Sequence, residues 1–323
     1  MQTRKLGFTD LNLTTIGFGT YALGGGDWQW GWGPQDDADS IAAIQTALEL
    51  GINWIDTAPA YGQGHAEEIV GQAIKGRDGV IIATKCGIAW EAGSPKVWNH
   101  LKADHIRREV EQSLRRLKID VIDLYQIHWP VPDEDIEEAW GVVAELVKAG
   151  KVRYGGVSNF SAAQMKRLQA IHPVASNQPP YSMVERLIEV ENLAFCAANN
   201  IGVVVYGPME SGLLTGKFTA ARVASLPDND WRKNFNVQFR QPNLKANMAL
   251  VDNLRLIAER HGKSVGELAI AWTLRRPEVT AAIVGGRSAA QIEGTVGAGD
   301  WVIAPEEITE IEALLVEREG ALA

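Results

Sequence analysis

Short apolar runs rich in Val and Ile alternate with amphipathic segments along most of this chain, and this alternation most constrains its fold. Continuous apolar runs of this kind are typical of parallel strands that helices cover on both faces. The runs predicted to be strands are Ile16–Gly19, Ile52–Ile55, Val80–Thr84, Val121–Ile127, Val152–Val157, Val174–Asn177, Val203–Tyr206 and Ala281–Val284. The helical patterns between them include Ala38–Leu50, Glu67–Lys75, Ile106–Leu117, Ile136–Lys148, Ala162–Ala170 and Glu185–Asn199.

Eight strand–helix units without a Pro- or Gly-rich linker predict an α/β fold, closed into a (β/α)8 TIM barrel. A doubly wound open sheet is the alternative that the same pattern allows. We expect residues 1–323 to form a single barrel domain. Before the first strand, Arg4–Leu13 reads as two short strands around a Thr-Asp turn, a β-hairpin suited to closing the bottom of the barrel.

Composition excludes several classes of protein. The formal net charge is -9 without a long Lys/Arg cluster, so we expect neither nucleic acid nor an anionic membrane as a partner. The segment Met1–Gly7 lacks the apolar core of a secretory signal, and no apolar run approaches the roughly 18 residues of a spanning helix. Cys86 and Cys196 are too few and too far apart for a disulfide framework or a zinc site. We therefore expect a cytoplasmic protein without a metal, and its oligomeric state stays open.

Three connections are much longer than usual: Ala22–Asp37, Gly87–Ala103 and Gly207–Asn243. Each follows a strand, so all three are expected at the mouth of the barrel, where long loops shape binding sites. They are rich in aromatic residues, for which local packing within the loop is the alternative role. The predicted substrate pocket consists of Trp28, Trp30, Trp90, Trp129 and Trp231.

Titratable residues stand at the ends of three predicted strands. Asp56 ends the second run, and Tyr61 follows it in the segment Asp56-Thr57-Ala58-Pro59-Ala60-Tyr61-Gly62. Lys85 ends the third run and His128 ends the fourth. Because the carboxyl ends of barrel strands open on one face, we expect these four side chains to meet there. Taken singly they have ordinary structural roles, but together they predict a phenol adjusted by an ammonium group for proton transfer.

These residues lie in motifs that resemble the aldo-keto reductases. Besides the Asp56–Gly62 segment, the likeness rests on five further motifs in the family's order: Ala83-Thr84-Lys85, Asp123–Pro130, Gly156–Phe160, Asn177–Tyr181 and Gly212–Lys217. The resemblance runs from Leu6-Gly7 to Gly285-Gly286-Arg287. Gln178-Pro179-Pro180-Tyr181 and Trp129-Pro130 look most like the bacterial general-stress and inositol-related branch.

The resemblance implies an NADPH-dependent enzyme that reduces a small-molecule aldehyde or ketone. Tyr61 would protonate the carbonyl oxygen while the nicotinamide delivers a hydride to the carbon. A free phenol has a pKa of about 10. Lys85 is expected to lower the pKa of Tyr61, with Asp56 holding the lysine in place, and a neutral His128 would orient the carbonyl.

The resemblance also assigns a cofactor site, although the chain lacks the Gly-x-Gly-x-x-Gly fingerprint of a Rossmann fold. Ser158, Asn159 and Gln178 match residues that hold the nicotinamide carboxamide, and Tyr206 matches the aromatic ring that stacks on it. Arg287 matches a site for the 2′-phosphate of NADPH, at a predicted helix start. The full predicted set is Gly19, Thr20, Asp56, Ser158, Asn159, Gln178, Tyr206, Gly207, Pro208, Met209, Gly212, Leu213, Lys217, Gly285, Gly286, Arg287, Gln291 and Thr295.

Three residues depart from the family pattern. Gly207 stands where many relatives have serine, Glu210 places a carboxylate in a phosphate-binding loop, and Thr295 replaces a frequent asparagine. Two other functions remain open from the sequence. One is a Schiff-base lyase that uses Lys85, which would require a neutral amine. The other is a cofactor-binding regulatory subunit of the same fold.

Overall fold

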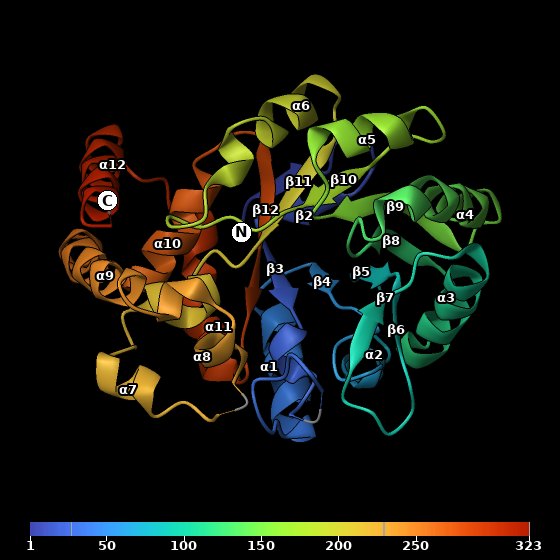
Figure 1. Cartoon of the computed structure of the whole chain (residues 1–323), viewed down its shortest axis with the longest axis horizontal. Coiled ribbons are helices and arrows are strands. Elements are labelled where there is room, and N and C mark those ends of the chain that lie inside the picture. Colours follow the sequence, from blue (N-terminus) through green and yellow to red (C-terminus); the bar gives the residue numbers. More distant parts are fainter. Residues whose placement is uncertain (27, 229, 323) are drawn as a thin grey trace.

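The computed structural model describes residues 1–26, 28–228 and 230–322. Within these residues, eight parallel strands close into a barrel in the order β10-β11-β12-β3-β4-β5-β8-β9, and helices surround it (Figure 1). The barrel strands are β3 (Ile16–Gly19), β4 (Trp54–Asp56), β5 (Ile81–Cys86), β8 (Ile122–Ile127), β9 (Val152–Ser158), β10 (Ser176–Gln178), β11 (Gly202–Tyr206) and β12 (Val279–Gly285). The predicted (β/α)8 barrel is confirmed, and the open doubly wound sheet is wrong.

The α-helices pack around the outside of this barrel and in its connections. They are α1 (Asp37–Glu49), α2 (His65–Ala73), α3 (Ala103–Leu117), α4 (Ile136–Lys148), α5 (Ala162–Gln169), α6 (Asn192–Ala198), α7 (Ala220–Ala224), α8 (Trp231–Asn234), α9 (Asn243–Glu259), α10 (Val265–Leu274), α11 (Ala289–Val296) and α12 (Pro305–Gly320). Short 3₁₀ helices occupy Tyr21–Leu23, Asp133–Asp135, Leu187–Glu189, Glu210–Thr215, Val237–Phe239 and Gly297–Asp300. In the described part of the chain, none of the helices has the length and apolarity of a membrane span.

The core has two layers because strand side chains alternate between the two faces of the barrel wall. Ile55 and Ile82 point outward into the main cluster between strands and helices. Trp54, Ala83 and Leu124 point inward and form a second cluster inside the barrel. Full burial of one large aliphatic side chain contributes roughly 1.5–3 kcal/mol, so the helix-covered layer supplies most of the driving force.

The indole of Trp54 fills the lower barrel interior, and Gly17 makes room for it. A Cβ at position 17 would lie 2.0 Å from the indole, closer than any real contact. Trp54 Nε1 donates a 3.0 Å hydrogen bond to the carbonyl of Thr14, which satisfies its buried polar atom. A side chain larger than glycine at position 17 would therefore displace Trp54.

The predicted N-terminal hairpin is confirmed. Strands β1 (Thr3–Lys5) and β2 (Asn12–Thr14) pair antiparallel. Leu6, Leu11 and Leu13 are buried in the inner cluster together with Trp54 and Leu124. The hairpin thus closes the end of the barrel opposite to its mouth.

Two predicted segments differ from the sequence pattern. The helix expected over Glu185–Asn199 is divided into a 3₁₀ turn and α6, because Glu191 has φ -141°, outside the helical region. Leu187 and Val190, which helped to create the helical pattern, are 75% and 80% exposed. The long loop after β5 contains an antiparallel hairpin, β6 (Ile88–Trp90) with β7 (Val97–Asn99).

Candidate active site

Lys85 lies at the centre of the barrel mouth, with an acceptor for each of its three ammonium protons. Its Nζ lies 2.6 Å from Asp56 Oδ2, 3.0 Å from the Thr57 carbonyl and 3.2 Å from the Tyr61 hydroxyl. The side chains of Lys85 and Asp56 are 1% and 4% exposed. The hydrogen bonds therefore form a buried chain from carboxylate to ammonium to phenol.

Strand register and a tight turn bring these three residues together. Asp56 is the last residue of β4 and pairs with Ala83 of β5, so Lys85 lies one inward position further along the neighbouring strand. Tyr61 follows a turn in which its N–H donates to the Ala58 carbonyl, and its own carbonyl accepts from Ala66 at the start of α2. Backbone hydrogen bonds to the preceding turn and to the following helix thus fix the position of Tyr61.

Burial shifts the pKa values of both Tyr61 and Lys85. It raises the pKa of Tyr61 well above the ordinary value, and the negative charge of Asp56 raises it further. Burial lowers the pKa of Lys85, which the charge and hydrogen bond of Asp56 oppose. The net direction for Tyr61 is upward because burial disfavours the charged phenolate, whereas the sequence suggested a lowered pKa. Tyr61 is a protonated phenol at neutral pH.

His128 lies beside the phenol, with ring centroids of His128 and Tyr61 5.8 Å apart. The backbone N–H of His128 donates to the Cys86 carbonyl, so the end of β5 positions the residue. Burial lowers the pKa of His128 well below the ordinary value, and the charge of Lys85 lowers it further. The imidazole is therefore neutral at pH 7, as expected from the sequence.

Two glutamines hold the second oxygen of Asp56, and sequence reasoning missed one of them. Gln178 Nε2 lies 2.7 Å from Asp56 Oδ1, and Gln126 Nε2 lies 3.5 Å from the same oxygen. Gln126 precedes His128 by two residues, so the alternation of the strand predicts that it shares the inward face. Both amides orient the carboxylate toward Lys85.

Ser158, Asn159 and Tyr206 form a connected polar group on the neighbouring strands. Tyr206 donates a 2.9 Å hydrogen bond to Asn159 Oδ1, and Asn159 Nδ2 donates to Ser158 Oγ and to the His128 carbonyl. Ser158 Oγ donates to the Gln178 carbonyl. Asn159 has φ +66°, a conformation that a non-glycine residue adopts at some energetic cost and that is common at functional sites.

The start of the third long loop has an unusual backbone. Glu210, Ser211 and Gly212 have φ values of +48°, +53° and +93° in succession. Glu210 and Ser211 line a cavity of about 260 Å³ together with Tyr206, Gly207 and Trp231. Successive backbone N–H groups in such a conformation form concavities that bind anions.

The side chains of the other predicted residues in this loop differ in how accessible they are to a ligand. Pro208 is buried and Met209 packs on the main core. Leu213 is 1% exposed inside a small apolar cluster of the loop, so only its backbone is available to a ligand. Glu210 accepts hydrogen bonds from Ser182 and Asn236, and burial raises its pKa.

Gly19, Thr20, Gly285 and Gly286 line the first and last strand ends. Gly19 pairs with Asp56 and Gly285 on the adjacent strands. Thr20 donates from both N–H and Oγ1 to the Asp56 carbonyl, so its hydroxyl is already engaged. These residues bring the backbone of the first and last strands close to Asp56, Tyr61, Lys85 and His128, the four residues called the tetrad below.

Arg287 precedes helix α11 as predicted, but its guanidinium already has acceptors. Nε donates to Gln35 Oε1 at 2.6 Å, and the terminal nitrogens donate to the carbonyls of Trp32 and Pro34. Gln291 accepts from the N–H of Arg287, and Thr295 Oγ1 donates to carbonyls of its own helix. Arg287 thus connects the first long loop to the start of α11.

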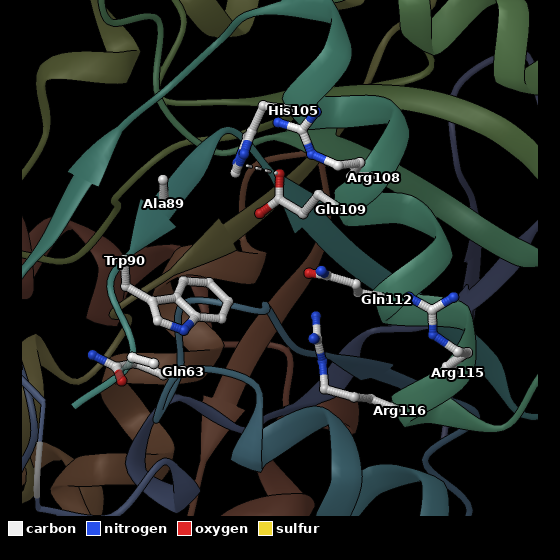
Figure 2. Close-up of a pocket in the computed structure, with 10 residues that line it drawn as sticks. Gln63, Ala89, Trp90, His105, Arg108, Glu109, Gln112, Arg115 and Arg116 are labelled. Atoms are coloured by element: carbon white, nitrogen blue, oxygen red, sulfur yellow. Dashed lines mark ion pairs between the residues drawn. The ribbon is translucent and has the colours of Figure 1, made fainter. Parts of the chain in front are cut away.

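The predicted tryptophans lie in four places. Trp28 is buried against Tyr61, with centroids 6.1 Å apart, and Trp30 packs on Trp28. Trp129 is stacked on His128. Trp231 lines the cavity beside Tyr206, whereas Trp90 projects into a different cavity between the β6–β7 hairpin and α3 (Figure 2).

Tyr21 is a residue of this wall that sequence reasoning missed. Its ring centroid lies 5.1 Å from that of Tyr61, and it also contacts Trp28 and Trp32. Its hydroxyl donates to the Trp30 carbonyl. Its place directly after Gly19-Thr20 at a strand end was the available signal.

Comparisons with known proteins agree with this geometry. A model of the aldo/keto reductase family matches residues 15–316. The aldo-keto reductase YhdN of Bacillus subtilis (strain 168) is 40% identical over 98% of this chain and 94% of that protein. The NADH-specific methylglyoxal reductase of Escherichia coli (strain K12) is 36% identical over 92% of this chain and 93% of that protein. A solved glycerol dehydrogenase from Gluconobacter oxydans aligns with a TM-score of 0.89 at 38% identity, over 98% of this chain and 96% of that one. The chain belongs to the aldo/keto reductase family.

Proposed function

We propose that the chain is an NADPH-dependent oxidoreductase that reduces aldehydes or ketones to alcohols, with Tyr61 as the proton donor. The buried hydrogen-bond chain from Asp56 through Lys85 to Tyr61 carries this proposal. Lys85 donates to the phenolic oxygen, so the proton of the phenol itself stays available for a substrate. Among the described residues there is no cluster that could hold a metal ion, and the proposal uses none.

Each side chain has a distinct role in the proposed step. The Tyr61 hydroxyl passes its proton to the carbonyl oxygen, and the Lys85 ammonium, 3.2 Å away, stabilises the phenolate that remains. Asp56 keeps the lysine charged and in place. The neutral imidazole of His128 donates a hydrogen bond to the same carbonyl and orients it. The cofactor supplies the hydride when bound.

The residues of the mouth fit a nicotinamide dinucleotide. Ser158, Asn159 and Gln178 offer amide and hydroxyl groups to a carboxamide, and the ring of Tyr206 offers a stacking face. At Gly207 an added Cβ would meet no atom within 4 Å, which leaves open space beside that ring. In the left-handed run from Glu210 to Gly212, the N–H groups of Glu210 and Gly212 donate to the carbonyls of Gly207 and Met209, which leaves the N–H of Ser211 for a phosphate oxygen.

The preference for NADPH rests on Arg287 and Arg232. Burial lowers the pKa of Arg287, and the positive charge of Arg232 lowers it further. The present acceptors of Arg287 are neutral, and a 2′-phosphate would replace them with charge-assisted hydrogen bonds, while the Arg232 guanidinium nearby stays paired with Asp230. Family membership alone does not decide this preference, because the E. coli relative is NADH-specific.

A cofactor-consumption screen tests the proposal. NADPH and NADH oxidation would be followed with methylglyoxal, aliphatic aldehydes, aromatic aldehydes and ketones, and NADP⁺ reduction with glycerol. We expect substrate-dependent oxidation of NADPH that depends on Tyr61. Tight cofactor binding without turnover of any compound would instead favour a regulatory subunit.

The Schiff-base alternative requires a free amine at Lys85. All three ammonium protons have acceptors, one of them a carboxylate at 2.6 Å, which stabilises the charged form. Borohydride reduction in the presence of the carbonyl panel should therefore trap no adduct on Lys85. A trapped adduct would contradict the role proposed for the lysine.

A further inference from the structure

A cavity of about 600 Å³ lies between the β6–β7 hairpin and helix α3 (Figure 2). Its described lining residues include none of Asp56, Tyr61, Lys85 and His128. Its volume is within the range of small-molecule sites. The cavity is thus separate from the candidate tetrad, although the same hairpin borders both.

One wall of the cavity is a single face of α3. His105, Glu109 and Arg116 are four and seven residues apart, which puts them on the same side of the helix. The opposite wall is the hairpin, from which the indole of Trp90 points toward the α3 side chains (Figure 2). A ligand between the walls would contact a flat aromatic face on one side and polar groups on the other.

The α3 wall carries cationic groups with free donors, in a chain whose net charge is -9. Arg115 makes no hydrogen bond or ion pair with the described residues. Arg116 Nε donates to Glu67 at 2.7 Å, but its Nη2 is buried without a partner among those residues. Arg108 also lines the cavity and pairs with Asp104 at the surface. These guanidinium groups favour a ligand with a compact negative charge.

Glu109, on the same face of α3, needs a hydrogen-bond donor rather than a negative charge. Glu109 is 2% exposed, and its Oε2 accepts a 2.7 Å hydrogen bond from the Gly87 N–H and lies 3.4 Å from His105 Nε2. Its Oε1 is buried and has no partner among the described residues. A carboxylate oxygen in this position needs a hydrogen-bond donor. A fully deprotonated inorganic anion such as sulfate offers none and would be repelled, and inorganic phosphate is too small to reach Glu109 and the arginines at the same time.

We infer that this cavity binds a polyhydroxylated phosphate ester, a sugar or polyol phosphate. The phosphate would lie against Arg115 and Arg116 Nη2, and a hydroxyl would donate to Glu109 Oε1. The apolar face of the carbon skeleton would pack on the indole of Trp90. Because Glu109 also holds Gly87, two residues after Lys85, the ligand would be one hydrogen bond away from the end of strand β5.

Calorimetric titration tests the site independently of any turnover. The protein, saturated with NADP⁺ to fill cofactor phosphate sites, would be titrated with glucose 6-phosphate, inorganic phosphate and glucose. We expect one saturable site for glucose 6-phosphate, with at least about tenfold weaker binding of each fragment, since each satisfies only one end of the cavity. Inorganic phosphate binding as tightly as the ester, or no saturable binding of the ester, would overturn the inference.

Two variants of the same helix locate the binding. Arg115→Gln removes a cavity cation at an exposed position and should weaken glucose 6-phosphate binding about tenfold. Arg107→Gln is the matched control, because the Arg107 guanidinium pairs with Glu145 and does not line the cavity. Binding that survives Arg115→Gln unchanged, or that falls equally in both variants, would put the ligand elsewhere.

Discussion

Lys85 and Asp56 form a buried ion pair at the mouth of the barrel, with Nζ 2.6 Å from Oδ2. The other two ammonium protons are directed to the Thr57 carbonyl and the Tyr61 hydroxyl. Breaking such a pair leaves an uncompensated charge in a desolvated site, which the fold strongly disfavours. The phenolic oxygen is therefore hydrogen-bonded to a lysine whose position two further acceptors fix.

Replacing Tyr61 with Phe should abolish carbonyl reduction and leave cofactor binding intact. The change removes the proton donor but keeps the ring that packs on Tyr21 and Trp28. General acid catalysis typically contributes about 10²–10⁴-fold, so kcat should fall by at least this order. Steady-state kinetics with fluorescence titration of the cofactor measures both. Turnover within a few-fold of the parent would exclude Tyr61 as the acid.

Replacing Lys85 with Met should shift the pH profile of alcohol oxidation upward. Burial and the charge of Asp56 already raise the pKa of Tyr61, and Lys85 is the cation in hydrogen-bond contact with the phenol. Without the ammonium, the phenolate that oxidation requires forms only at higher pH. The profile is measured as kcat against pH for the parent and the variant. An unchanged profile would show that Lys85 does not adjust the tyrosine.

Replacing Arg287 with Ala should reduce the selectivity for NADPH over NADH by about tenfold or more. The variant removes the guanidinium proposed for the 2′-phosphate and spares the tetrad. Arg260→Ala is the control, because Arg260 pairs with Glu310 at the surface. The ratio of kcat/KM for the two cofactors is the measurement. Equal use of NADPH and NADH by the parent would refute the phosphate site.

Replacing His128 with Asn should flatten the loss of stability at acid pH. The pKa of His128 is lowered in the fold, so below about pH 6.5 the unfolded chain binds a proton that the native chain does not. Stability from this group is therefore present above the unfolded pKa and lost as pH falls. The slopes of unfolding free energy against pH for the parent and for His128→Asn should differ by about 1 kcal/mol per pH unit below about pH 6.5.

Urea denaturation of the cofactor-free protein between pH 5 and pH 8 measures this difference. His65→Asn is a control, because His65 is a half-buried residue that lies away from His128 and pairs with Asp37. Parallel pH curves for the parent and His128→Asn would show that the imidazole is not kept neutral by the fold.

Replacing Arg116 with Met should destabilise the fold by about 3–5 kcal/mol near neutral pH, because Glu67 is fully buried and loses its ionic partner. Burial raises the pKa of Glu67, which Arg116 opposes. In the variant, the folded-state pKa of Glu67 is no longer opposed by Arg116 and stays raised. The free energy of unfolding is therefore greatest at low pH, where Glu67 is protonated, and it falls as the pH rises through this folded-state pKa. The exposed neighbour variant Arg115→Met is the control, and denaturation at pH 5 and pH 8 compares them. A loss independent of pH would mean that packing of Arg116 matters more than its charge.

The strands could be predicted because their signal is local. Runs of Val and Ile bounded by polar residues placed β3 without error and β8 within a residue at its start. The segment Glu185–Asn199 failed for the opposite reason, since its apolar residues Leu187 and Val190 face solvent and periodicity alone does not reveal what a face packs on.

The sequence by itself determined the barrel, its closing hairpin and the meeting of Asp56, Tyr61, Lys85 and His128, because strand ends and side-chain alternation are fixed by local pattern. Only the tertiary structure decided what surrounds each charge. It raised the pKa of Tyr61 through burial, gave Arg287 the acceptors of a loop about 250 residues away, and turned Trp90 toward α3. These properties depend on desolvation and on contacts between distant segments, which no short stretch of sequence contains.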